Sequence, residues 1–493
     1  MLAVLLQLQL AHAAPAVSQV LRREIVADRR DAWEVVPLGA EGLLLVGSDD
    51  RGDAFTFTRY DADFAPLWTR DWAPPVKVEL RGAWVDGGDA WLLLHGRGAD
   101  FTVLGVDLAT GEPTAFPLTS PVKRTREVEG LFVRGDDAWL TAGRGAIDPV
   151  EGGDGTLVHV DLPAGTVEAL DVAGLVGAKD VRIRHVQPTA EGVSVVATLD
   201  TQRHRTLYVV DVKGGDMSGA LALSPPEEDD TNLLGALRVP ASTGGDLVVG
   251  TYAQGATDVG AQGMFLARYV DGRPDWLRYH SFLSFQHFFD YLPPAMRERL
   301  DRRIERKAEK GLELDLGYRV SLHAPLVIGN RYVLVGEAYY PQYHTVTTTT
   351  TANGTTTSTS HQVFDGWRYT HAVVAAFDQL GDLMWDASVP IGNVLSPTIR
   401  DQVAVSVEGD HVHMLYCVGG KVYSLQADGD EVSGEKAEQR LIATGGDATV
   451  KASWESRAAW WYDDWFLLWG YERIKEKGAR RTVFAFSKVS ASR

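Results

Sequence analysis

The sequence contains a single cysteine, Cys417, among its 493 residues. One cysteine cannot form a disulfide within the chain, so no disulfide framework stabilises the fold. The residue stands inside an apolar segment, HMLYCVGG, where a free cysteine behaves as a small hydrophobic side chain. We therefore predict that Cys417 is buried and structural.

Basic residues are too few for two classes of partner. The chain has 48 Lys and Arg against 66 Asp and Glu, a formal net charge of -18. Nucleic acids and anionic membranes are both bound through basic surfaces, so neither is an expected partner. No later apolar run approaches the ~20 residues of a membrane-spanning helix, so no transmembrane segment is predicted. The HExxH, GxSxG, P-loop and CxxC signatures of common active sites are also missing.

The first residues have the pattern of a secretory leader. An apolar run over residues 2–10 precedes Ala11-His12-Ala13, which fits the small-x-small pattern of a cleavage site. The run is too short to span a bilayer. We predict a signal peptide over residues 1–13 and a secreted or periplasmic protein. Because no lysine or arginine precedes the run, the alternative is an apolar start to a cytoplasmic protein.

A short polar turn, usually Gly-Asp or Gly-Gly-Asp, runs into an apolar strand eight times along the chain. Such a long-range period indicates an array of similar small units. Each unit reads as four short strands, as in ELRGAWV, AWLLLHG, TVLGVDL and EPTAFPL of the second repeat. The apolar strands begin at Leu43, Ala90, Ala138, Val193, Leu247, Tyr332, His411 and Trp465.

The repeats predict an all-β fold, a single β-propeller of eight four-stranded blades over residues 14–493. The last repeat supplies only three strands, and residues 17–27 form an orphan strand that would complete its blade. Completing the blade in this way removes exposed sheet edges. A seven-bladed propeller is the alternative, if the weak repeat around residues 403–443 belongs to a neighbouring blade.

Two insertions interrupt the period. The first, about residues 283–317, contains the helix-forming segment AMRERLDRRIERKAEKG, which ends at a capping glycine, Gly311. We expect its apolar residues Met296, Leu300 and Ile304 to dock on the rim. The second, residues 345–360, is rich in threonine around Asn353-Gly354, a strong hairpin-turn signal. It predicts a polar β-hairpin, with a disordered tip as the alternative.

Several repeats share a cadence of aspartate, glycine and tryptophan, as at Asp107 to Gly111, Asp61 to Trp68 and Asp378 to Trp385. This cadence resembles the D-x-x-x-G-x-x-x-W strand pair of PQQ-like, eight-bladed propellers of bacterial periplasmic and outer-membrane proteins. That family includes quinone-dependent dehydrogenases and assembly factors. Its dehydrogenases carry a vicinal cysteine pair near the quinone, which a lone cysteine cannot form. The resemblance therefore implies architecture and compartment rather than quinone chemistry.

Candidate binding residues fall into two groups. Aromatic side chains flank the threonine-rich insertion and could anchor a ligand or partner; they are Tyr339, Tyr340, Tyr343, Trp367 and Tyr369. The glycine-rich loop DPVEGGDGT carries Asp148, Glu151 and Asp154, whose oxygens could hold Ca²⁺. A solvated turn is the alternative for this loop, and no other cofactor is predicted.

Glu337 interrupts the apolar run VLVGEAYYP. It would either face the central channel as an acid or base or lie on an exposed strand face. With no catalytic signature, we predict an extracytoplasmic, monomeric binding scaffold for a protein or carbohydrate ligand. The alternative is a secreted carbohydrate-active enzyme, a hydrolase or lyase, that uses channel carboxylates.

Overall fold

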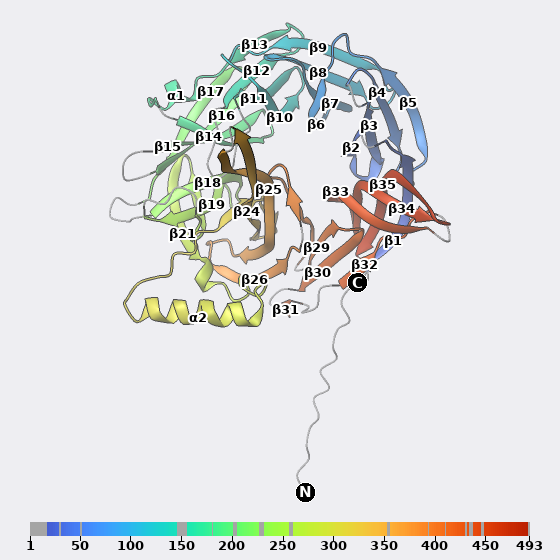
Figure 1. The fold of residues 1–493 in the computed structure, drawn as a ribbon. Helices are drawn as coiled ribbons and strands as arrows, with labels where there is room; N and C mark the ends of the chain where they lie inside the picture. Colours follow the sequence, from blue (N-terminus) through green and yellow to red (C-terminus); the bar gives the residue numbers. More distant parts are fainter. Residues whose placement is uncertain are drawn as a thin grey trace. The chain divides into compact units, whose positions relative to one another are not determined.

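The computed structural model describes the chain except for residues 1–16, 29–30, 50–51, 145–154, 180, 201–204, 226–230, 256–259, 353–354, 393, 410, 429–430, 433–436, 445–447 and 492–493. The chain divides into two compact units. One comprises Asp28–Asp401, and the other comprises Met1–Ala27 together with Gln402–Arg493. Each unit is built from antiparallel sheets (Figure 1).

Six sheets make up the unit Asp28–Asp401, and five of them are four-stranded meanders in chain order. Their strands are β2 (Ala32–Pro37), β3 (Leu43–Ser48), β4 (Phe55–Tyr60) and β5 (Pro66–Trp72); β6 (Glu79–Asp86), β7 (Asp89–His95), β8 (Asp100–Asp107) and β9 (Pro113–Thr119); β10 (Glu127–Arg134), β11 (Asp137–Gly143), β12 (Thr156–Asp161) and β13 (Thr166–Ala169); β14 (Val181–Pro188), β15 (Val193–Asp200), β16 (Arg205–Lys213) and β17 (Asp216–Leu223); and β18 (Thr231–Pro240), β19 (Asp246–Gln254), β20 (Gly263–Val270) and β21 (Arg273–Ser281).

The sixth sheet has a four-strand path with two short strands beside it. The path is β22 (Arg319–Leu322), β24 (Arg331–Ala352), β25 (Thr355–Phe377) and β26 (Leu383–Pro390); β23 (Leu326–Ile328) pairs with β24 and β27 (Leu395–Ser396) with β25. The unit also contains the short helices η1 (Gly39–Glu41), α1 (Val172–Leu175) and η2 (Phe282–Ser284), and the longer α2 (Pro294–Ala308).

The predicted polar turns join the first and second strands of the sheets. Between β6 and β7, Asp86 pairs with Asp89, and the two glycines between them have φ angles of 61° and 93°. Glycine adopts these left-handed conformations without the steric cost that a side chain brings. The apolar second strands that follow are almost entirely buried, and all eight that the sequence predicts are present.

The aspartate–glycine–tryptophan cadence joins neighbouring sheets. The Asp107 carboxylate accepts hydrogen bonds from the backbone N–H groups of Ala109 and Thr110, at 2.9 and 2.6 Å, and so shapes the turn after β8. Trp68, on the preceding sheet, lies against Gly111 of this turn, where a β-carbon would approach its ring to 2.8 Å. The Trp68 indole also donates to the Leu108 carbonyl at 3.0 Å. The motif therefore works as a contact between consecutive sheets.

The insertion that carries α2 is anchored by the residues before the helix. Phe282 and Phe288 are buried and stacked with ring centroids 4.2 Å apart. The Asp386 carboxylate accepts from two backbone N–H groups of the insertion, at 2.7 Å each. In α2 itself, Leu300 packs on this cluster while Met296 is 56% exposed. Docking therefore depends on the phenylalanines more than on the predicted helix face. The helix ends at Ala308, and Gly311, whose φ angle is 66°, lies in the turn that follows, where its N–H donates to the Ala308 carbonyl at 2.9 Å.

The threonine-rich insertion extends the blade strands β24 and β25. The two strands pair along their whole length, from Tyr332–Phe377 to Ala352–Thr355, and the register shifts at two places. Exposed hydroxyls pair across it, as Thr347 with Ser360 at 2.9 Å. The predicted hairpin is confirmed, and its Asn353-Gly354 tip lies outside the described residues.

The second unit contains two sheets. Its strands are β28 (Ala404–Glu408), β29 (His411–Val418), β30 (Lys421–Asp428), β31 (Glu431–Val432) and β32 (Ala437–Arg440) in one sheet, and β1 (Val17–Val26), β35 (Ala479–Ala491), β34 (Trp465–Glu476) and β33 (Thr449–Tyr462) in the other. The N-terminal strand β1 completes the last sheet by pairing with β35, as predicted. The buried Arg22 also connects β1 to β34, because its guanidinium donates to Glu472 of β34 at 2.5 Å and to Glu24 of β1 at 2.8 Å.

The described residues thus form eight sheets, each with a four-strand antiparallel path, and β1 completes the last of them. This is an all-β, eight-bladed propeller fold. The seven-bladed alternative is wrong, because β28 to β32 form a sheet of their own. Cys417 is buried as predicted. Within the described part of the chain, no helix is both long and apolar enough to cross a membrane.

Candidate functional site

A cavity of about 1350 Å³ lies within the unit Asp28–Asp401. Its wall is formed mainly by the first strands of consecutive sheets, β10, β14, β18 and β22, and by the segment Ile399, Arg400 and Asp401. First strands meet around a common space in a propeller, which explains why residues far apart in sequence share one wall. Trp84 and Phe132 add an aromatic surface, with ring centroids 5.2 Å apart.

Much of the charge on the cavity wall is paired. Arg238 donates to Asp211 at 2.6 Å and to Asp246 at 2.8 Å. Lys213 forms an ion pair with Glu191 at 2.9 Å. The wall therefore carries many charged side chains that neutralise one another, within a surface whose larger part is apolar.

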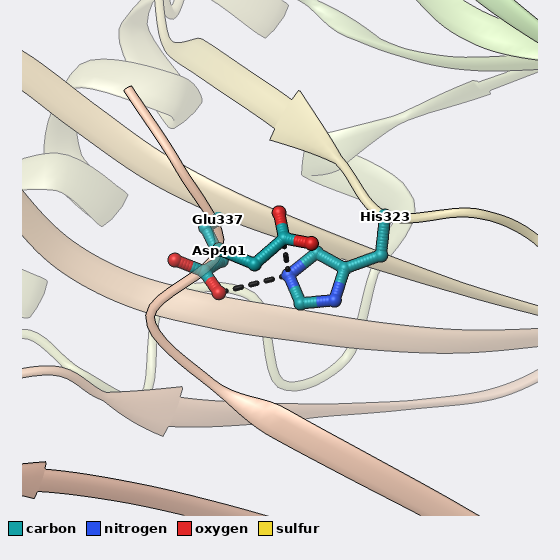
Figure 2. Close-up of side chains that lie close together, drawn as sticks. All are labelled: His323, Glu337 and Asp401. Atoms are coloured by element: carbon teal, nitrogen blue, oxygen red, sulfur yellow. Dashed lines mark hydrogen bonds and ion pairs between the residues drawn. The ribbon is translucent and has the colours of Figure 1, made fainter. Parts of the chain in front are cut away.

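One cluster on this wall combines an imidazole with two carboxylates (Figure 2). Nε2 of His323 lies 2.8 Å from Oε1 of Glu337 and 3.5 Å from Oδ1 of Asp401. Both carboxylates therefore approach the same ring nitrogen. His323 and Asp401 line the cavity, and the fully buried Glu337 stands beside His323.

Three separate segments hold this cluster in place. Glu337 lies within β24, where it pairs with Ser321 of β22 and Ala372 of β25, so its backbone is fixed on both sides. His323 follows β22 directly, and its N–H donates to the Val335 carbonyl at 2.9 Å.

The segment that carries Asp401 is held by a tyrosine hydroxyl. Tyr369 Oη donates to the Arg400 carbonyl at 2.8 Å and accepts from the Arg400 N–H at 3.0 Å. Tyr369 is itself buried on β25. This residue, predicted as part of a ligand surface, therefore has a positioning role toward the residue next to Asp401.

Two histidines of the wall have pKa values shifted in opposite directions. Burial acts to lower the pKa of His323, but the carboxylates of Asp401 and Glu337 outweigh it and raise the pKa to about 9. Burial lowers the pKa of His185 to about 4, against a smaller opposing effect of Asp401. The cavity thus presents one neutral imidazole and one that is strongly stabilised in its charged form.

A third histidine, His371, is buried in the insertion's aromatic cluster. Its ring stacks on Tyr291 at 3.9 Å between centroids, and its Nδ1 lies 2.9 Å from the Thr370 hydroxyl. Burial lowers the pKa of His371 to about 3. This environment favours a neutral ring that packs as part of the core.

The predicted aromatic residues do not form one surface. Tyr339 and Tyr369 are buried at 3% and 2% exposure, whereas Tyr340 and Tyr343 are 46% and 51% exposed. Trp367 links the two environments, 5.4 Å from the Tyr339 ring between centroids. Exposure of Tyr340 and Tyr343 at the base of the hairpin leaves them available for contacts. The predicted calcium ligands Asp148, Glu151 and Asp154 lie outside the described residues.

The sequence singled out Glu337 but missed its two neighbours. An exposed strand face for Glu337 is wrong, because the residue is fully buried against His323. The interruption of an apolar run was the signal that identified it. His323 and Asp401 stand in short polar connections, RVSLHAP and SPTIRDQ, which look like ordinary loops.

Comparisons with known proteins find similar structures but no match by sequence. No protein-family model and no curated protein sequence matches the chain. Among solved structures, the chain is similar to the polysaccharide lyase Uly1, at 10% identity over 85% of this chain and 92% of the lyase, with a TM-score of 0.40. It is also similar to the dihydro-heme d1 dehydrogenase NirN, at 12% identity over 95% of this chain and 78% of that one, with a TM-score of 0.43.

A third similar structure is the β-propeller domain of the Trilobed protease from Pyrococcus furiosus, at 10% identity over 82% of this chain and 97% of the domain, with a TM-score of 0.34. Identities and TM-scores of this size transfer no activity to the chain. The fold assignment rests on the sheets themselves, and the site must be argued from its own residues.

Proposed function

We propose that this protein is an extracytoplasmic binding protein that holds a carbohydrate in the cavity of the unit Asp28–Asp401. The observation that supports the proposal is the cavity of about 1350 Å³, whose largely apolar wall also carries polar side chains such as His323 and Asp401. Pockets for single small ligands have volumes of roughly 300–1000 Å³. A larger space that combines apolar surface with polar groups suits an oligomeric ligand such as an oligosaccharide.

The wall combines the two kinds of contact that a sugar ring needs. Trp84 and Phe132 offer an aromatic surface for the apolar face of a sugar. Ion-paired side chains such as Arg238 with Asp211 are held in fixed positions and still offer donors and acceptors to hydroxyl groups. The proposed extracytoplasmic location rests on the leader-like pattern of residues 1–13 and the acidic composition.

Occluding the cavity tests the proposal. Ala324 lines the cavity and is exposed, so Ala324→Trp would fill space there without disturbing the core. The untagged chain is titrated calorimetrically with a panel of neutral and uronate-containing oligosaccharides, beside Ala324→Trp and the matched control Ala324→Ser. We expect binding to the parent chain and to Ala324→Ser, and loss in Ala324→Trp. No binding to any oligosaccharide, or equal binding to both variants, would refute the proposal.

A second candidate is a carbohydrate-active enzyme, a hydrolase or lyase. It is favoured by the convergence of the Glu337 and Asp401 carboxylates on the His323 imidazole at the cavity wall. Carboxylates and imidazoles are the groups that most often move protons in enzymes. The two carboxylates flank one ring nitrogen rather than face each other across a substrate-sized gap, so a two-carboxylate glycosidase mechanism is not supported. Chain-length analysis of the same oligosaccharides after incubation, with Asp401→Asn as control, tests for cleavage.

A further inference from the structure

We propose that His323, Glu337 and Asp401 form a binding site for a divalent first-row transition metal such as Zn²⁺. The inference goes beyond the proposed carbohydrate binding and does not require it. It begins with the three side chains, each of which offers one ligand atom, and these atoms all lie within 4.8 Å of one another.

The distances fit a shared ion. Metal–ligand bonds of about 2.0–2.2 Å place neighbouring donor atoms roughly 3–3.5 Å apart. Nε2 of His323 lies 2.8 Å from the Glu337 oxygen and 3.5 Å from the Asp401 oxygen. Small side-chain adjustments would therefore bring the three atoms around one ion. Figure 2 shows both carboxylates directed at the same edge of the imidazole.

The charges also fit a divalent ion. The Glu337 and Asp401 side chains supply two carboxylates to the cluster. A divalent cation between them balances their two negative charges. Buried charge is costly unless it is balanced, and the Glu337 carboxylate is fully buried.

The position of the cluster gives the ion an open side. Glu337 is enclosed in the sheet, whereas the Asp401 side chain is 59% exposed and lines the cavity with His323. Three protein ligands with remaining positions open to a cavity are the arrangement of zinc sites that bind water or a ligand oxygen. The ion would thus present its free coordination positions to the cavity.

The ligand types select among metals. An imidazole nitrogen suits Zn²⁺ and its first-row neighbours, whereas Mg²⁺ and Ca²⁺ take oxygen ligands almost alone. Only one of the three ligands here is a nitrogen, so Mn²⁺ and Co²⁺ are expected to bind as well, more weakly than Zn²⁺ in accordance with the general order of affinities.

Metal titration of the untagged, chelator-treated full chain tests the site. Zn²⁺ is titrated by calorimetry, and Co²⁺ is added separately because its visible absorption reports a nitrogen–oxygen ligand set. We expect one site per chain. Asp401→Asn should weaken it by more than the roughly 10–100-fold that the loss of a merely orienting partner costs. Asp401 is exposed enough that this variant should fold, and Glu337→Gln is the second variant, with circular dichroism as the folding check.

The matched control is Asp137→Asn. Asp137 also contacts a histidine, His159, at 2.6 Å, but outside the proposed site. Its variant should bind Zn²⁺ like the parent chain. The proposal is overturned if the parent binds no Zn²⁺ stoichiometrically, if Asp401→Asn binds equally well, or if Asp137→Asn causes the same loss. Because only metal is added in this experiment, a negative result would not decide whether the cavity binds an oligosaccharide.

Discussion

Two histidines in the same unit each contact two carboxylates, but in different ways. His159 on β12 has one carboxylate on each ring nitrogen: Asp137 lies 2.6 Å from Nε2 and Glu168 lies 2.9 Å from Nδ1. His323 has both carboxylates on Nε2. In the first arrangement the ring bridges two acids across a sheet. In the second, three polar atoms converge on one point beside a cavity.

Exposure to solvent further separates the carboxylate contacts of His159 from those of His323. The side chains of Asp137 and Glu168 are 38% and 56% exposed, so water screens their attraction to His159. The Glu337 side chain is 1% exposed, so its interaction with His323 is hardly screened. The comparison teaches that the number of charged neighbours does not make a site. Convergence on one atom, burial and access to a cavity together distinguish His323.

We expect the largest loss of stability where a buried ion pair is broken, away from the cavity and its histidines. Arg22, Glu24 and Glu472 in the last sheet have side chains only 4–6% exposed. Arg22→Ala would leave Glu472 buried without this cation, and breaking a buried pair in this way costs about 3–5 kcal/mol. Chemical denaturation should show this loss in the free energy of unfolding. A loss below about 1 kcal/mol would mean that burial does not set the strength of these pairs.

Glu337→Ala should be somewhat less costly. Its partner His323 can lose a proton and avoid a stranded charge, so we expect a loss of about 3 kcal/mol, at the low end of the range for broken buried pairs. Asp137→Ala, beside the screened His159, should cost about 0–1 kcal/mol. Denaturation of the two metal-free variants side by side tests the contrast directly. Equal losses would show that the two histidine sites are energetically alike.

Acid should destabilise the protein through His371, whose pKa is shifted by burial and not by neighbouring carboxylates. The pKa of His371 is lowered by burial from 6.5 to about 3. The neutral ring is therefore favoured in the folded state, and its contribution is complete above pH 6.5 and lost as the pH falls toward 3. Between pH 6.5 and 4.5 this loss should reach roughly 2–3 kcal/mol.

The variant His371→Phe keeps a ring against Tyr291 and cannot titrate. The difference in unfolding free energy between parent and variant, followed over this pH range, isolates the histidine from the many carboxylates that titrate with it. A constant difference would show that His371 has the same pKa in the folded and unfolded states, which would contradict the lowered pKa.

The fold was predictable because its signals are local. Most second strands of the blades follow a glycine turn such as Gly87-Gly88 and begin an apolar run, and counting strands identified the role of β1. The site was only partly predictable. A carboxylate inside an apolar strand pointed to Glu337, but His323 and Asp401 stand in loops whose proximity arises only when β22, β24 and the segment after β27 assemble.

The smallest effect is expected from the hairpin over residues 345–360, which serves as a baseline for the comparison. Thr345 and Thr347 are exposed, and the extension adds strand pairs beyond the blade without burying a core side chain among those described. Two-stranded ribbons of this kind contribute little stability. Replacing residues 345–360 by a short Gly-Asn turn should change the free energy of unfolding by no more than about 0.5 kcal/mol and leave Zn²⁺ binding unchanged.

The same replacement tests whether the hairpin contacts a partner. Tyr340 and Tyr343 remain at its base, so partners that need only these side chains would still bind. Partners that use the row of hydroxyls or the strand edge would be lost. Affinity capture from a periplasmic or culture-supernatant fraction, with parent and replaced chains compared, separates the two cases. Identical partners for both chains would contradict a binding role for the hairpin, and a large loss of stability would contradict its use as a baseline.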